Sequence, residues 1–175
     1  RRQAMIKSLG KNINVIEMRG NINTRLKKLK NSNIDGIILA KAGLRRMEMD
    51  SLITQNLSVE SFVPSPGQGV LCIECLSQHS EIMSKIRKIV HLNTEICVSA
   101  ERIFAAQMDG DCMSPIGAHA TIQKDLITIT GFVATADGTR YIRNKIEGNK
   151  NNYKDLSTKL SNLFIKMGSK GMLKC

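Results

Sequence analysis

The stretch Asp109-Gly110-Asp111-Cys112-Met113-Ser114-Pro115-Ile116-Gly117 separates a helical pattern from a run of strand patterns, so it decides how the C-terminal half folds. Before it, residues 94–108 repeat apolar side chains at the spacing of one helical face. Gly110 favours a helix end because glycine adopts positive φ at little cost, and Pro115 prevents the helix from continuing. Cys112 is therefore predicted to lie on a short loop between a helix and a sheet. Its position alone gives it no role, because a lone cysteine is most often a small buried apolar residue.

After this loop the sequence has the pattern of an antiparallel sheet. Strand patterns lie at residues 118–123, 126–134 and 139–147. Asp137-Gly138, just before the third of them, is a strong hairpin signal. Residues 153–167 then carry a helical apolar stripe that stops at Gly168. We predict a small α+β domain in which helices cover three antiparallel strands.

The first third has an α/β pattern. Strand patterns at 14–18 and 36–40 alternate with helical patterns at 1–8, 22–29 and 41–47. Asn21 is a suitable N-cap for the second helix. Ligands favour the carboxyl ends of strands in such layouts, which places Arg19, Arg25 and the Arg45-Arg46 pair near one rim. For any single arginine, a solvated strand end explains the position equally well.

A breaker segment at residues 62–69 interrupts this pattern before another strand pattern at 70–74. Gly67 and Gly69 allow the backbone to approach a neighbour closely. Gln68 between them could face a cleft, or the segment could be a hinge without ligand contact.

The charge balance points to an anionic partner. The chain has 26 Lys+Arg against 15 Asp+Glu, a formal net charge of +11. Nucleic acid is disfavoured because 2 Tyr, 4 Phe and no Trp provide few rings for base stacking. Small polycarboxylates fit the same sign of charge, since guanidinium groups pair with carboxylates in bidentate geometry. A solvated lysine-rich surface is the plainer alternative.

The 5 cysteines are odd in number and scattered, which predicts reduced thiols and a cytoplasmic protein. Cys72 and Cys75 lack a second pair at zinc spacing, so we expect them to pack and we predict no metal site. No apolar run approaches the roughly 20 residues of a membrane span, and no membrane partner is expected.

Four stretches carry a family resemblance, and they stand in the family's order. They are Arg19-Gly20-Asn21-Ile22-Asn23-Thr24-Arg25-Leu26, the run from Asp35 to Arg46, the run from Pro66 to Glu74, and Ser99-Ala100-Glu101-Arg102 followed by Gly110-Asp111-Cys112-x-x-Pro115-Ile116-Gly117. Together they resemble hydroxymethylbilane synthase, also called porphobilinogen deaminase. Four ordered matches across most of the chain make coincidence very improbable.

The resemblance implies a multidomain fold of α/β and α+β parts. Residues 1–62 would belong to a second α/β domain of periplasmic-binding-protein-like fold. Residues 63–92 would form a crossing segment and a returning part of the first α/β domain. Residues 93–175 would form the C-terminal α+β domain, with a three-stranded antiparallel sheet, helices and the cofactor cysteine.

The resemblance also implies a cofactor and its ligands. In the family a dipyrromethane is held through a thioether on the cysteine that matches Cys112. Gly20 and Gln68 are expected to be cofactor-binding residues. Positions that match five arginines contribute to binding the acetate and propionate groups of the cofactor and of the growing pyrrole chain. These arginines are Arg1, Arg2, Arg19, Arg25 and Arg46.

The implied activity is that of a cytoplasmic, monomeric transferase of porphyrin (heme, tetrapyrrole) biosynthesis. Such an enzyme joins four porphobilinogen molecules with loss of ammonia and releases hydroxymethylbilane. Asp111 departs from the glycine common in the family at that place and adds a negative charge beside the thiol. The family's catalytic aspartate belongs to a first domain, most of which we expect to be absent, so the chain is predicted to be inactive alone.

Two other functions fit parts of the sequence. A basic nucleic-acid-binding α/β module would explain the net charge and would bind arbitrary DNA or RNA in a salt-sensitive way. A non-catalytic structural remnant would fold without binding any ligand.

Overall fold

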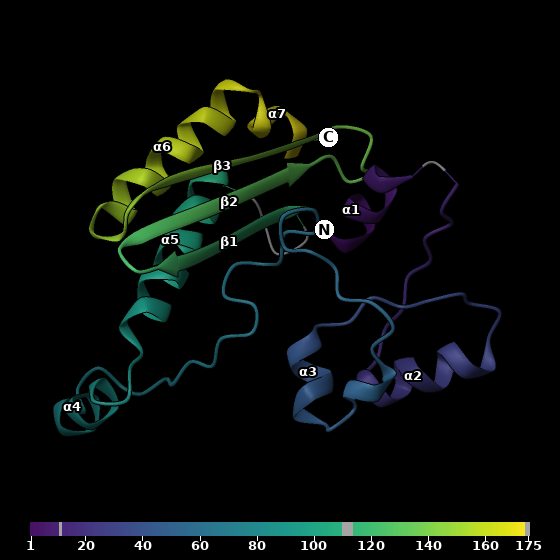
Figure 1. The fold of residues 1–175 in the computed structure, drawn as a ribbon, viewed down its shortest axis with the longest axis horizontal. Helices are drawn as coiled ribbons and strands as arrows, with labels where there is room; N and C mark the ends of the chain where they lie inside the picture. The colour runs from purple at the N-terminus through teal and green to yellow at the C-terminus, as the bar shows by residue number, and fades with distance from the viewer. Residues whose placement is uncertain (11, 110–113, 174–175) are drawn as a thin grey trace.

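The computed structural model describes residues 1–10, 12–109 and 114–173 (Figure 1). Its elements in chain order are α1 (Arg2–Leu9), α2 (Ile22–Asn31), α3 (Lys41–Arg46), η1 (Asp50–Leu52), α4 (Ser80–Arg87), α5 (Leu92–Met108), β1 (Ile116–Gln123), β2 (Leu126–Ala134), β3 (Tyr141–Asn149), η2 (Lys150–Asn152), α6 (Tyr153–Lys166) and α7 (Ser169–Leu173). Gly110, Asp111 and Cys112 lie outside the described residues.

The three C-terminal strands form an antiparallel sheet in the order β1-β2-β3, as predicted (Figure 1). In its register, Ile129 on the central strand lies opposite Ala120 and Ile146. Helices α5, α6 and α7 pack on the sheet and close the main core. Phe104 of α5 and Phe164 of α6 meet edge to face there, with ring centroids 4.9 Å apart.

A second, smaller core joins the start of the chain to the far end of β2. Phe132 and Ala134 pack with Ala4 and Met5 of α1 and with Phe62 and Val63. Alternate residues of a strand face opposite sides, so these two β2 residues point away from the face that carries Ile129. Helix α1 therefore lies against the C-terminal sheet although more than a hundred residues separate them (Figure 1).

The described helix boundaries follow local sequence signals. Asn21 caps α2 as predicted, because its Oδ1 accepts the N–H of Thr24 at 2.8 Å. Gly168 follows α6 with a φ of 89°. Gly110, which we predicted at the end of α5, lies outside the described residues. Helix α5 ends at Met108, and the residue after it, Asp109, has a left-handed φ of 56°. Aspartate tolerates this conformation better than most residues, because its short side chain can form local hydrogen bonds.

The strands predicted at residues 14–18, 36–40 and 70–74 are not formed, and these predictions are wrong for this structure. A strand needs a neighbour to receive its backbone hydrogen bonds, and a parallel sheet needs cover on both faces. In residues 70–74 the apolar side chains are instead exposed, including Leu71 at 85% and Ile73 at 59%, whereas those of residues 37–40 are partly buried. The sequence carries the apolar pattern, but the described residues pair none of these segments with another strand.

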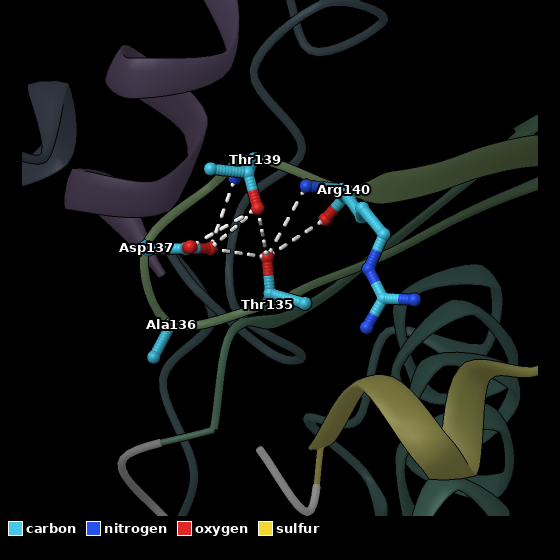
Figure 2. A pocket seen from close by; sticks show the side chains of 5 residues that line it. All are labelled: Thr135, Ala136, Asp137, Thr139 and Arg140. Atoms are coloured by element: carbon cyan, nitrogen blue, oxygen red, sulfur yellow. Dashed lines mark hydrogen bonds between the residues drawn. The ribbon is translucent and has the colours of Figure 1, made fainter.

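The turn between β2 and β3 is organised by one carboxylate (Figure 2). Asp137 Oδ1 accepts the hydroxyl of Thr135 at 2.5 Å and both the N–H and the hydroxyl of Thr139, at 3.0 and 2.9 Å. These hydrogen bonds, that from Thr135 first, lower the pKa of Asp137 to about 2. A shallow pocket beside the carboxylate is lined by Thr135, Ala136, Asp137, Thr139 and Arg140. The hydrogen bonds within the turn explain why these polar side chains lie together.

We expect Asp137→Asn to lower the melting temperature at pH 7, because an amide accepts these hydrogen bonds more weakly than a carboxylate. The native carboxyl has a depressed pKa, so its stabilisation is present above the ordinary value of 3.8 and is lost as pH falls through about 2. The two melting temperatures should therefore converge on acidification. Asp35→Asn, at another exposed aspartate, is the control. A constant gap between Asp137→Asn and the unsubstituted chain from pH 7 to 2 would contradict this account.

Candidate functional site

The start of α1 meets the breaker segment through Arg1. Its Nε donates to Ser65 Oγ at 3.0 Å, Nη1 to the Val63 carbonyl at 2.6 Å, and Nη2 to Gln68 Oε1 at 3.3 Å. Burial, with a smaller contribution from the charge of Arg2, lowers the pKa of Arg1 to about 10. The guanidinium is therefore still charged at pH 7. Two predicted site residues, Arg1 and Gln68, are in direct contact.

A line of contacts leads from this point to the second and third helices. Arg2 Nη1 donates to the Ile38 carbonyl at 3.4 Å, three residues before α3 begins. Within α3, a Cβ added to Gly43 would come 2.8 Å from Cδ1 of Ile22 on α2. The contacts therefore run from α1 to the segment before α3, and from α3 to α2.

The turn before α2 brings together three more predicted residues. Arg25 Nε donates to the Gly20 carbonyl at 2.8 Å, and Arg19 Nε contacts Glu17 Oε1 at 2.9 Å. Gly20 has a φ of 119°, and a Cβ there would lie 2.9 Å from Cγ2 of Thr24, so the turn requires glycine. Arg19, Gly20 and Arg25 form one basic turn with an exposed outer side.

Arg46 lies in the last turn of α3 and is exposed. Its neighbour Arg45 is held by Asp50, with Nε 3.0 Å from Oδ1. We expected the arginines to lie along one rim at the ends of strands. In the structure they lie instead at or near the ends of helices. The described contacts do not join Arg46 directly to the other predicted arginines.

Sequence reasoning missed Glu101 on α5. It is 5% exposed, and its Oε2 accepts the Gly67 N–H at 2.6 Å while Oε1 accepts the Ala120 N–H at 2.8 Å. Burial raises the pKa of Glu101, and the two backbone hydrogen bonds oppose that rise. A signal was present, because Glu101 shares a helical face with the buried Phe104 and Met108. A carboxylate in an apolar stripe calls for hydrogen-bond donors from another element.

Strand β1 is also tied to the breaker segment. Ala118 N–H donates to the Pro64 carbonyl at 3.0 Å. A Cβ on Gly117 would lie 2.9 Å from the Val63 carbonyl oxygen, so the close approach depends on glycine. Residues 63–67 are therefore fixed by both β1 and α5.

These side chains suit a ligand with several carboxylates. The bond from Arg25 to Gly20 uses one of five guanidinium N–H donors, and guanidinium groups bind carboxylates in bidentate geometry. Among residues 1–10, 12–109 and 114–173, no group of three His, Cys, Asp or Glu is arranged to hold a metal ion. Within the same ranges no helix has both the length and the apolar character to cross a bilayer.

Comparison with known proteins agrees with this chemistry. The family model "Porphobilinogen deaminase, dipyromethane cofactor binding domain" matches residues 1–84, and "Porphobilinogen deaminase, C-terminal domain" matches residues 95–166. A porphobilinogen deaminase of Clostridium botulinum (strain Kyoto / Type A2) is 39% identical over 166 residues, which are 95% of this chain and 56% of the relative. Porphobilinogen deaminases of Trichlorobacter lovleyi and Alkaliphilus metalliredigens are 34% and 38% identical over 173 residues, which are 99% of this chain and 55% of each relative. The chain spans about half the length of these curated relatives. It belongs to the porphobilinogen deaminase family.

Proposed function

We propose that this chain is part of a transferase of tetrapyrrole biosynthesis, which joins four porphobilinogen molecules with loss of ammonia into hydroxymethylbilane. The observation that carries the proposal is the match of two porphobilinogen deaminase domains, in order, over residues 1–84 and 95–166. The basic turn at Arg19, Gly20 and Arg25 supports it, because every porphobilinogen unit brings carboxylates. A net charge of +11 has the matching sign.

The proposed cofactor is a dipyrromethane linked to Cys112 by a thioether. When bound, dipyrromethane supplies the pyrrole end to which further units are joined. The thiol of Cys112 suits the attachment because thiolate is a strong carbon nucleophile and a thioether resists hydrolysis. Cys112 itself lies outside the described residues, so its role rests on the motif and on this chemistry.

The proposed work of the arginines is to bind and orient pyrrole carboxylates. Arg2, Arg19, Arg25 and Arg46 would do so directly, since their side chains reach the surface or lie near it. Arg1 and Gln68 bind each other and line the junction with the breaker segment. Holding a charged chain by several such contacts lowers the entropy lost when the next unit arrives.

The proposed domain division is 1–62, 63–92 and 93–175, with a periplasmic-binding-protein-like fold for the first part in the assembled enzyme. A catalytic aspartate would come from residues outside this chain, which alone would be inactive. We further propose a cytoplasmic monomer without nucleic-acid or membrane partners. The net charge is then accounted for by the carboxylates of the substrate.

The test is a chimera in which this chain replaces the matching 56% of the Clostridium botulinum relative. We expect it to consume porphobilinogen, and we expect Arg25→Leu to slow consumption by roughly 10- to 100-fold. That range corresponds to one charge-assisted hydrogen bond, about 1.5–3 kcal/mol. Porphobilinogen consumption is measured at saturating and limiting substrate.

Arg87→Leu is the matched control, because Arg87 is an exposed arginine held by Glu95 at 2.8 Å on the α4–α5 side of the chain. It should consume porphobilinogen at the unsubstituted rate. An Arg25→Leu chimera with normal turnover would refute the carboxylate-binding role of that arginine. An unsubstituted chimera that consumes no porphobilinogen would refute the proposed function.

A further inference from the structure

Glu101 lies where α5, β1 and the breaker segment meet, and it connects all three. Each carboxylate oxygen accepts a different backbone N–H, that of Gly67 and that of Ala120. Two such hydrogen bonds satisfy a buried carboxylate and compensate part of its desolvation. The side chain therefore fixes the distance between the helix, the strand and the loop.

The loop that Glu101 holds is compact. The Gln68 N–H donates to the Ser65 carbonyl at 3.0 Å, and the Val70 N–H donates to the Gly67 carbonyl at 3.2 Å. Gly67 has a φ of 70°, in the left-handed region that favours glycine. Because two successive turns share Gly67, fixing its N–H also fixes the direction in which Gln68 leaves the backbone.

Gln68 in turn contacts Arg1. The same amide oxygen accepts from Arg1 Nη2 and from the Ser65 N–H, at 3.3 and 3.5 Å. Arg1 also donates to Ser65 Oγ. A continuous set of hydrogen bonds thus runs from Glu101 through Gly67 and the 65–68 turn to Arg1 at the start of α1.

We propose that Glu101 is a positioning residue, which fixes the 65–69 turn against α5 and β1 and thereby places Gln68 and the Arg1-Arg2 pair for pyrrole carboxylates. This inference rests on the proposed function, because the ligand is the one proposed there. Glu101 touches no substrate. It acts through the loop, so its loss weakens binding without removing a reacting group.

The first test measures the loop itself in the 175-residue chain. In Glu101→Gln the side chain keeps one acceptor oxygen, but its second position becomes an NH₂ donor that faces a backbone N–H. We expect amide exchange at Gly67, followed by NMR, to accelerate by about tenfold or more, the scale of one charge-assisted hydrogen bond. Exchange at Ile129 in the sheet core should stay unchanged.

Glu95→Gln is the matched control for this test. Glu95 is on the same helix, but it is exposed and pairs with Arg87 on the surface. Its replacement should alter neither the Gly67 nor the Ile129 amide. A Glu101→Gln chain with unchanged Gly67 exchange would overturn the proposal.

The second test separates positioning from folding in the chimera. A positioning role predicts that Glu101→Gln raises KM for porphobilinogen by about tenfold while kcat changes little, because uniform binding is lost. A merely structural role would lower the amount of active protein, which reduces kcat and leaves KM unchanged, and that result would overturn the proposal.

Gln68→Ala provides a second variant in case Glu101→Gln folds poorly. We expect it to raise KM to a similar extent with Gly67 exchange unchanged, since Gln68 lies beyond Gly67 in the set of hydrogen bonds. The double variant should show no further rise in KM, and full additivity would overturn the proposal. If the unsubstituted chimera consumes no porphobilinogen, the proposed function has failed, and Gly67 exchange still shows whether Glu101 holds the loop.

Discussion

Cys112→Ser in the chimera is expected to abolish the covalent pyrrole adduct and to reduce turnover by at least roughly 10³-fold. A serine hydroxyl is far less ionised than a thiol near neutral pH, so it cannot replace the thiolate as the attached nucleophile. Loss of a covalent catalytic group has effects of this size in other enzymes. Intact-mass analysis of the loaded protein, followed by peptide mapping, locates the adduct.

The other cysteines provide the controls. Burial, with a smaller effect from Glu101, raises the pKa of Cys97 to about 11, so little of it is thiolate at pH 7. Cys72 is exposed in this structure and is the more serious competitor. Cys97→Ser and Cys72→Ser should both keep the adduct and normal turnover. An adduct mapped to either residue, or normal turnover of Cys112→Ser without bound pyrrole, would contradict the assignment.

Phe104→Ala is expected to lower the free energy of unfolding of the 175-residue chain by about 3–5 kcal/mol, the usual cost of deleting a buried ring. Phe104 is 0% exposed and contacts the edge of Phe164. Across the core it lies over Gly131, where an added Cβ would be 2.6 Å from its Cζ. Urea denaturation followed by circular dichroism measures the change.

The same contact predicts a non-additive pair of substitutions. Gly131→Ala should cost about 1–3 kcal/mol, because the new methyl overlaps the Phe104 ring. In the double variant with Phe104→Ala the overlap is gone, so the total cost should be less than the sum of the two. Gly36→Ala is the control, since a Cβ there meets nothing within 4 Å. Strict additivity would show that the ring does not limit the space at Gly131.

The parts of the fold that sequence analysis predicted correctly depend on neighbours in the chain. The Asn21 cap acts over three residues, and the hairpin at Asp137-Gly138 joins two strands through a short turn. The apolar stripe of α6 records one face of a single helix. Such signals predict the local structure whatever the rest of the chain does, because the partner of each residue is close by in the sequence.

The parts that it missed depend on distant partners. The apolar pattern at 70–74 is typical of a buried strand. A strand forms only where a neighbouring strand receives its backbone hydrogen bonds, and the pattern does not show whether such a neighbour is present. Glu101 finds Gly67 across 34 residues, and no local period identifies that pair. The arginines were chosen by resemblance to a family, and the structure describes contacts for several of them without testing their proposed role.

The small core between α1 and β2 has a consequence for how the chain is made. Translation proceeds from the N-terminus, so Ala4 and Met5 leave the ribosome long before Phe132 and Ala134, the residues that they pack against, have been synthesised. The contact also closes a loop of more than a hundred residues, which is entropically unfavourable until the sheet exists. Ala4 and Met5 can therefore pack on Phe62 and Val63 first, and they gain Phe132 and Ala134 as partners only after the C-terminal sheet has been made.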